Sequence, residues 1–127
     1  MSENRDIEEA ILLLGRLMYE RNPAFADEFA PDATLVGSEP GEVARGREAI
    51  RALIATFHGL PARFTWEWDR IDHGIAGAVA WFFAEGAAVK EDANGARTRR
   101  PYRLSGVLRA EGPSWQWLLF NGSEPKS

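Results

Sequence analysis

The sequence predicts an α+β fold in which helices come first and an antiparallel sheet follows. Apolar residues between Ile7 and Met18 recur at spacings of three and four, which is typical of an amphipathic helix. From Phe64 onward apolar and polar residues alternate, which is typical of strands, and turn residues divide that region into successive strands. At 127 residues the chain fits one domain, spanning 1–127.

Three helices are expected in the first half of the chain. The first begins near Asp6. The second is short: it begins at Asn22 and Pro23, because Asn can cap a helix and Pro suits its first position, and it ends near Pro31. The third is stopped by Gly59 and Pro61. Its buried stripe consists of Ala49, Ile50, Leu53, Ile54 and Phe57.

A short strand, Thr34 to Val36, is expected between the second and third helices, and the turn-rich stretch 37–46 follows it. Four further strands are expected at 64–69, 78–89, 99–109 and 114–120. The turns between them are short, so these four strands predict an antiparallel meander.

The strand at 78–89 is apolar on both of its faces. One face carries Val79, Trp81 and Phe83, and the other carries Ala80, Phe82 and Ala84. Helices cover one face of a sheet, so the other face of this strand needs a second cover. A homodimer packed through the outer sheet face would provide it. Alternatively, the small residues Ala80 and Ala84 lie beneath a neighbouring turn or loop.

The composition excludes several classes of partner. The chain has 15 basic and 19 acidic side chains and a formal charge of -4, so no general attraction to nucleic acid or to a membrane is expected. It has no cysteine, which removes disulfides and thiolate nucleophiles and favours a cytoplasmic protein. The apolar run 11–14 is too short for an export signal or a membrane span. Phosphate-binding loops and nucleophile elbows are absent from the sequence, and we expect no cofactor.

Five segments together resemble the SnoaL-like branch of the nuclear transport factor two-like (ketosteroid isomerase-like) superfamily. They are Phe29 to Thr34, Gly46 to Ile50, Val79 to Trp81, Tyr102 to Leu108 and Trp117 to Glu124. The resemblance covers nearly the whole chain. It implies a cone-like, mixed but mainly antiparallel curved sheet, wrapped around three N-terminal helices and enclosing an apolar pocket. It also implies a dimer, but it does not imply one activity, because this fold carries many.

The resemblance argues against the best-known reaction of the superfamily. In ketosteroid isomerases a carboxylate base follows the strand after the Asp-Ala-Thr segment, and a first-helix tyrosine helps to form the oxyanion hole. Those positions fall near Gly37 and Leu14 here, and Tyr19 lies five residues away on another face of the helix. Asn121 stands where the SnoaL-like ending often has a histidine, and an amide can orient a ligand but cannot shuttle protons.

The aromatic residues suggest a pocket for a flat apolar ligand such as a polyketide, steroid or terpenoid fragment. The predicted ligand-binding residues are Tyr19, Phe29, Trp66, Trp68, Trp81, Phe83, Glu85, Tyr102, Trp117 and Asn121. The alternative for each aromatic residue is a place in a packed core.

Two residues are candidates for catalysis. Glu85 shares strand parity with Trp81 and Phe83, so in a pocket its pKa would be raised toward that of a general base. Alternatively, Glu85 pairs across strands with an arginine such as Arg103. His58 follows the last turn of the third helix, where a histidine ordinarily makes a favourable dipole contact.

No metal is expected. Asp69, Asp72 and His73 are close in sequence, but they are expected in a hairpin turn without a second cluster of ligands.

Three functions remain open from the sequence. The first is a small-molecule-binding domain without established chemistry. The second is a cofactor-free isomerase, cyclase or hydrolase that uses Glu85, with His58, Tyr102 or Asn121 as partners. The third is an association module that dimerises through its two-sided apolar strands.

Overall fold

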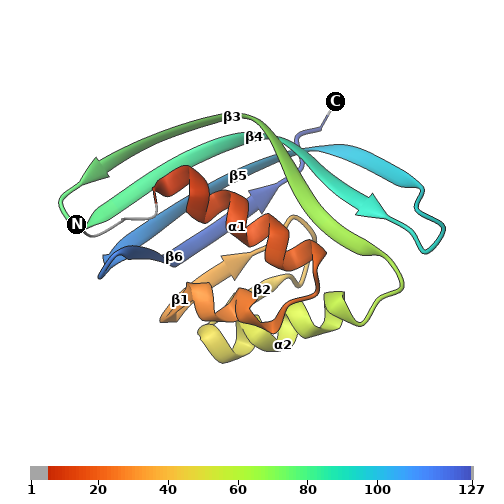
Figure 1. Cartoon of the computed structure of the whole chain (residues 1–127), viewed down its shortest axis with the longest axis horizontal. Coiled ribbons are helices and arrows are strands. Elements are labelled where there is room, and N and C mark those ends of the chain that lie inside the picture. The colour runs from red at the N-terminus through yellow and green to blue at the C-terminus, as the bar shows by residue number, and fades with distance from the viewer. Residues whose placement is uncertain (1–5, 127) are drawn as a thin grey trace.

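The computed structural model describes residues 6–126 and contains one strongly curved, six-stranded sheet (Figure 1). The strand order is β2-β1-β6-β5-β4-β3, and only the β1–β6 pair is parallel within the described residues. The helices are α1 (Ile7–Tyr19), η1 (Pro23–Glu28) and α2 (Arg47–His58). The strands are β1 (Phe29–Val36), β2 (Val43–Arg45), β3 (Arg63–Ala76), β4 (Val79–Glu91), β5 (Arg97–Glu111) and β6 (Ser114–Ser123). The predicted α+β class, with a curved mixed sheet around N-terminal helices, is confirmed.

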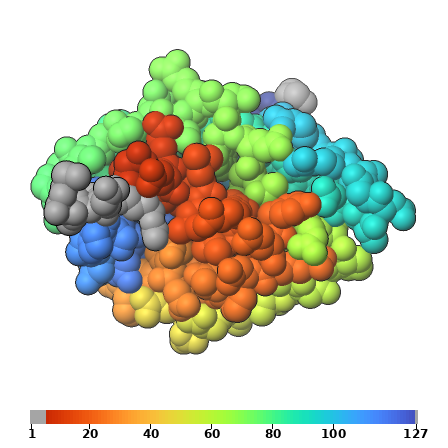
Figure 2. All heavy atoms as spheres, in the orientation of Figure 1, coloured from red at the N-terminus to blue at the C-terminus, as the bar shows by residue number. Residues whose placement is uncertain are grey.

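Helix α1 begins where the sequence predicts. The carboxylate of Asp6 caps the helix by accepting the backbone N–H of Glu9 at 2.7 Å. The apolar stripe of α1 is buried, and it lies across the concave face of the sheet (Figure 1). In Figure 2 the atoms of the first helices fill the centre of the view and cover the strands behind them.

The second helix is shorter than predicted and is a 3₁₀ helix. Asn22 caps η1 by accepting the N–H of Ala24 at 2.9 Å, as expected of Asn before Pro. The helix ends at Glu28, and β1 begins at Phe29, so the expected end near Pro31 was wrong. Residues 29 and 30 are fully buried and β1 already pairs with β6 there, so tertiary packing determines the boundary.

The N-cap of helix α2 is Gly46, and no side chain in the described residues caps the helix. Gly46 has a φ of 92°, a conformation that favours glycine, and its N–H donates to the Ala33 carbonyl at 2.7 Å. The Arg47 Nε donates to the Phe29 carbonyl at 2.8 Å, which ties the start of α2 to β1. The helix ends at His58 before Gly59, as predicted.

Register shifts in β3 and β6 change which residues share a face of the sheet. In β3 the register shifts between Trp68 and Arg70, and in β6 Trp117 and Leu119 pair with adjacent residues of β5. Trp117 and Phe120 therefore both lie on the buried face, although simple alternation places them on opposite faces.

The hairpin between β3 and β4 turns later than predicted. Asp69, Asp72 and His73 lie inside β3, and the turn to β4 is at residues 77–78. The expectation that these three residues occupy a hairpin turn was wrong, because β3 pairs with β4 as far as Ala76.

The centre of the core is a cluster of buried aromatic rings. Trp117 is fully buried, and its ring centroid lies 5.8 Å from Phe29, 5.3 Å from Phe82 and 5.8 Å from Phe120. Phe25 continues the cluster from η1, 5.5 Å from Phe29. These contacts connect the 3₁₀ helix, β1, β4 and β6.

Candidate functional site

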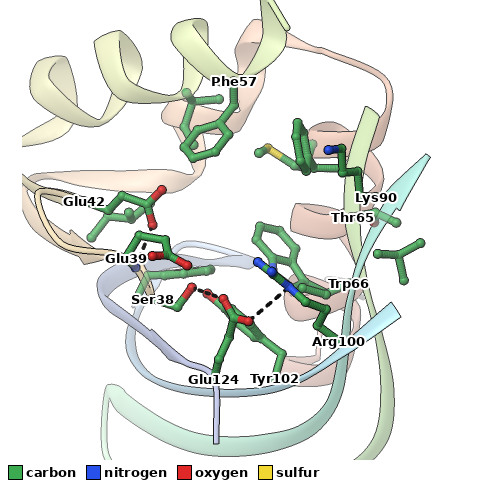
Figure 3. Close-up of a pocket in the computed structure, with 18 of the residues that line it drawn as sticks. Ser38, Glu39, Glu42, Phe57, Thr65, Trp66, Lys90, Arg100, Tyr102 and Glu124 are labelled. Carbon is green, nitrogen blue, oxygen red and sulfur yellow. Dashed lines mark hydrogen bonds and ion pairs between the residues drawn. The ribbon is translucent and has the colours of Figure 1, made fainter. Parts of the chain in front are cut away.

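A cavity of about 490 Å³ lies between the helices, the β1–β2 loop and one end of the sheet (Figure 3). That end consists of the first residues of β3 and β5 and the last residues of β4. Its apolar lining comes from Met18, Phe25, Leu35, Leu53, Ile54, Phe57, Phe64, Trp66, Ala88, Val89 and Phe120. Its polar and charged lining comes from Ser38, Glu39, Glu42, Thr65, Lys90, Thr98, Arg100, Tyr102 and Glu124, together with Gly37. The volume is sufficient for a small organic molecule.

Aromatic rings form two sides of the cavity. Phe57 of α2 and Phe64 of β3 meet edge to face with centroids 5.7 Å apart. The Trp66 ring lies 5.5 Å from Phe120 and 6.3 Å from Tyr102. A flat ligand would find ring faces and edges on both sides.

Charged groups gather at the mouth of the cavity, as Figure 3 shows. One carboxylate oxygen of Glu124 accepts the Ser38 hydroxyl hydrogen at 2.9 Å, and the other pairs with the Arg100 Nε at 3.2 Å. These contacts fix the segment after β6 against the β1–β2 loop and β5.

The second carboxylate at the mouth, Glu42, is held by its own loop. It is half-buried, and its Oε1 accepts the Glu39 N–H at 3.1 Å. The Gly37 N–H donates to the Glu42 carbonyl at 2.6 Å. A Cβ on Gly37 would meet the Glu42 carboxylate and lie 2.8 Å from its Cβ, so glycine at position 37 leaves the space that the Glu42 side chain fills.

Tyr102 provides a neutral hydroxyl beside these carboxylates. Burial is the largest cause that raises the pKa of its phenol, and the charges of Glu42 and Glu124 raise it further, while a hydrogen bond with Trp66 acts in the opposite direction. The hydroxyl therefore stays protonated at physiological pH, because its pKa moves further above an already high value.

Of the predicted ligand-binding residues, the structure brings Trp66 and Tyr102 together on the cavity wall. Trp68 lies 6.3 Å from Tyr102 but does not line the cavity. Phe29 and Trp117 lie in the closed aromatic core, which is the alternative that the sequence left open.

Trp81, Phe83 and Glu85 lie away from the cavity. Trp81 is 52% exposed, Phe83 is half-buried, and Glu85 is exposed and opposite Arg103 in the strand register. The inward face of this part of β4 belongs instead to Ala80, Phe82 and Ala84, because Phe82 packs against Trp117. The parity assignment that placed Glu85 among pocket aromatics is therefore corrected, and Glu85 cannot act on a ligand in this cavity.

Tyr19 and Asn121 also lie outside the cavity lining. The Tyr19 hydroxyl donates to Glu91 at 2.7 Å, which raises its pKa, and the Arg63 guanidinium lies 5.5 Å from the centre of its ring. Asn121 is exposed on β6, and its backbone carbonyl accepts a hydrogen bond from the Ser105 hydroxyl at 3.5 Å.

His58 is partly buried at the end of α2 and does not line the cavity. Burial, and secondly the charge of Arg21, lower its pKa, which favours a neutral imidazole. Its Nε2 has no hydrogen-bond partner within the described part of the chain. Among residues 6–126 no three histidine or carboxylate side chains come together in a way that could hold a metal ion.

The sequence interpretation missed the charged residues at the mouth: Glu39, Glu42, Arg100 and Glu124. Two glutamates in the turn-rich stretch after a buried strand were a usable signal, because loops at the open end of a curved sheet border its interior. Phe64 could also have been found, since it shares strand parity with Trp66.

The sheet, the helices inside its curve and the cavity between them define an α+β domain of the nuclear transport factor two-like type. The sequence pattern of the SnoaL-like domain family matches residues 7–125, and the chain belongs to that family. Small-molecule-binding, isomerase and dehydratase domains share this fold. No curated protein sequence matches the chain significantly. No helix in residues 6–126 is long and apolar enough to span a membrane.

Solved structures share the fold at low sequence identity. A proposed dehydratase of the NTF2-like family from Streptomyces avermitilis has a TM-score of 0.82 and 13% identity, covering 95% of each chain. A Catenulispora acidiphila protein in complex with S-DNPA has a TM-score of 0.80 and 16% identity, covering 93% of this chain and 90% of its own. A proposed calcium/calmodulin-dependent protein kinase II association domain from Xanthomonas campestris has a TM-score of 0.76 and 19% identity, covering 91% and 82%.

Proposed function

We propose that this protein binds a flat, largely apolar small molecule in the cavity, with the polar end of the ligand at the charged mouth. The observation that carries the proposal is the distribution of the lining. Apolar side chains from α1, η1, α2, β3 and β6 surround the interior, and the charged groups gather at the mouth. Such a cavity, apolar with a few placed polar groups, is the usual form of a small-molecule site.

The apolar walls can supply useful affinity. Removing about 200 Å² of apolar ligand surface from water contributes about 5 kcal/mol before the costs of association. The neutral Tyr102 hydroxyl can donate a hydrogen bond to a ligand oxygen without a change of protonation state.

The catalytic alternative based on Glu85 is not supported, because Glu85 lies outside the cavity. His58 does not replace it, since it also lies outside the lining. The carboxylates that do line the cavity are Glu39, Glu42 and Glu124, and Glu124 is already paired with Arg100.

Binding can be tested by thermal stabilisation with a panel of flat aromatic alcohols of increasing ring number. At ten times its dissociation constant, a ligand that binds only the folded state adds about 1.4 kcal/mol of stability. For a domain of this size that raises the melting temperature by about 5 °C. A sugar of similar size serves as the polar control and should give no shift. The proposal fails if no aromatic alcohol gives a larger shift than the sugar.

The outer face of the sheet supports a second copy of the chain as a partner. Trp81 is 52% exposed and Val79 is 40% exposed. In the strand register Trp81 of β4 lies opposite Val107 of β5, and Val107 lies opposite Leu119 of β6. An exposed aromatic residue beside aliphatic neighbours is typical of an interface. We therefore propose a homodimer through this face.

Light scattering on the wild type and on Trp81→Lys tests the dimer. The wild type should have the mass of two chains, and the lysine variant should shift toward the mass of one chain, since a charge on the apolar face disfavours its burial. Leu12→Lys, an equally exposed position on α1, is the matched control and should leave the mass unchanged. A wild type with the mass of one chain would overturn this proposal.

A further inference from the structure

We propose that the ligand of this cavity carries a cationic group, an amine in its protonated form, which sits at the mouth against the Glu42 carboxylate. This inference rests on the proposed binding function and adds the chemical class of the ligand. The Glu42 side chain, the glycine that makes room for it and the pairing of the other charges at the mouth carry the argument.

Within the part of the chain that the structure describes, no basic side chain neutralises the charge of Glu42. Among residues 6–126 no Lys or Arg forms an ion pair with Glu42, and its hydrogen-bond partner is the uncharged N–H of Glu39. That bond goes to Oε1, and Oε2 has no hydrogen bond within the described part of the chain. Figure 3 shows the carboxylates of Glu42 and Glu39 on the same side of the cavity. A half-buried carboxylate with free acceptor capacity favours a cationic or strongly donating group on the ligand.

The positive charges at the mouth do not offer an equivalent place for an anion. Arg100 pairs with Glu124, whose second oxygen is bound by Ser38, so this arginine already has an anionic partner. Lys90 is exposed and lies across the cavity from Glu42 (Figure 3). Two of the three glutamates at the mouth, Glu39 and Glu42, therefore have no basic partner among residues 6–126, whereas Glu124 has one.

The position of Glu42 depends on the backbone around it. The Gly37 N–H donates to the Glu42 carbonyl, and the Glu42 N–H donates to the Glu39 carbonyl at 3.1 Å. These two backbone hydrogen bonds hold the loop between β1 and β2 in place. Because Gly37 has no side chain, the Glu42 side chain occupies the space beside it. A side chain at position 37 would displace the Glu42 carboxylate and leave its charge unchanged. A variant at Gly37 therefore tests where the carboxylate lies, and a variant at Glu42 tests its charge.

The inference can be tested with three ligands that share one naphthalene ring. They carry an aminomethyl, a hydroxymethyl or a carboxylate group at the same ring position. Their affinities are measured by titration calorimetry at neutral pH. The amine should bind about three- to fivefold more tightly than the alcohol, the range expected of a partly solvated ion pair. The carboxylate should bind more weakly than the alcohol. High salt should reduce the preference for the amine, because the charges are partly exposed.

Two variants locate the preference. Glu42→Gln should remove the advantage of the amine and leave the affinity for the alcohol unchanged within about twofold, since the alcohol depends on the apolar walls. Gly37→Ala should reduce the advantage of the amine while keeping the charge. Glu111→Gln, at an exposed glutamate that does not line the cavity, is the matched control and should keep the full preference.

The outcomes separate this inference from the function on which it rests. If none of the three compounds binds, the binding function itself is contradicted. If the alcohol binds as tightly as the amine, or the carboxylate binds most tightly, the cavity still binds ligands but the preference for a cation is overturned. Retention of the amine preference in Glu42→Gln would also overturn it.

Discussion

The Trp117→Ala variant should lose about 3–5 kcal/mol of unfolding free energy, the range for removing a large aromatic side chain from a core. Trp117 is fully buried and contacts rings from β1, β4 and from elsewhere in its own strand. Its removal leaves a cavity where the 3₁₀ helix, β1 and the sheet meet, and these elements cannot all move to fill it. Urea denaturation followed by circular dichroism measures the change.

Trp117→Phe is the matched control. It keeps an aromatic ring among Phe29, Phe82 and Phe120, and it removes an indole N–H that has no hydrogen-bond partner in the described residues. Since an unpaired buried N–H is unfavourable, part of the lost packing is offset, and the phenylalanine variant should lose less than half as much stability as the alanine variant. A loss below about 1 kcal/mol for Trp117→Ala would contradict the role of this residue as the centre of the core.

The Ala88→Trp variant should weaken binding of an aromatic alcohol by at least about tenfold, or about 1.4 kcal/mol. Ala88 lines the cavity from β4, and in the strand register it lies between Trp66 of β3 and Arg100 of β5. An indole at this position occupies space that the ligand needs. Because Ala88 is only partly buried and borders an open cavity, the fold should accept the larger side chain.

Calorimetric titration of Ala88→Trp with a naphthalene alcohol measures this loss, and circular dichroism establishes that the variant is folded. Ala76→Trp adds the same side chain at an exposed position at the end of β3 and should bind as the wild type does. Undiminished binding by a folded Ala88→Trp protein would place the ligand outside the cavity.

Much of the fold could be predicted because local signals and tertiary packing agree in this chain. Asp6 caps the first helix, Asn22 and Pro23 start the second, and Gly59 ends the third, each by backbone chemistry that the sequence shows directly. The error at Pro31 arose because β1 pairs with β6, a partner more than 80 residues away in the chain that no local pattern indicates.

The site was harder to predict because alternation does not say which strand face is inside. Trp81 and Phe83 are larger than Ala80 and Ala84, yet the face with the alanines is buried, since Phe82 lies between them and fills the space against Trp117. The register shift in β6 then moved Phe120 to the same side as Trp117. Glu42 was missed because its place in the cavity depends on how its loop closes over Gly37.

The most direct test of the central claim is to find where a flat aromatic alcohol binds, using the indole N–H signals of the tryptophans in a nitrogen-15 correlation spectrum. The chain has five tryptophans, and Trp66 lines the cavity while Trp81 lies on the outer sheet face. Trp66→Phe and Trp81→Phe variants assign the two signals. We expect the Trp66 signal to shift on addition of the alcohol and the Trp81 signal to stay in place. A shift of Trp81 with an unchanged Trp66 would contradict binding in the cavity.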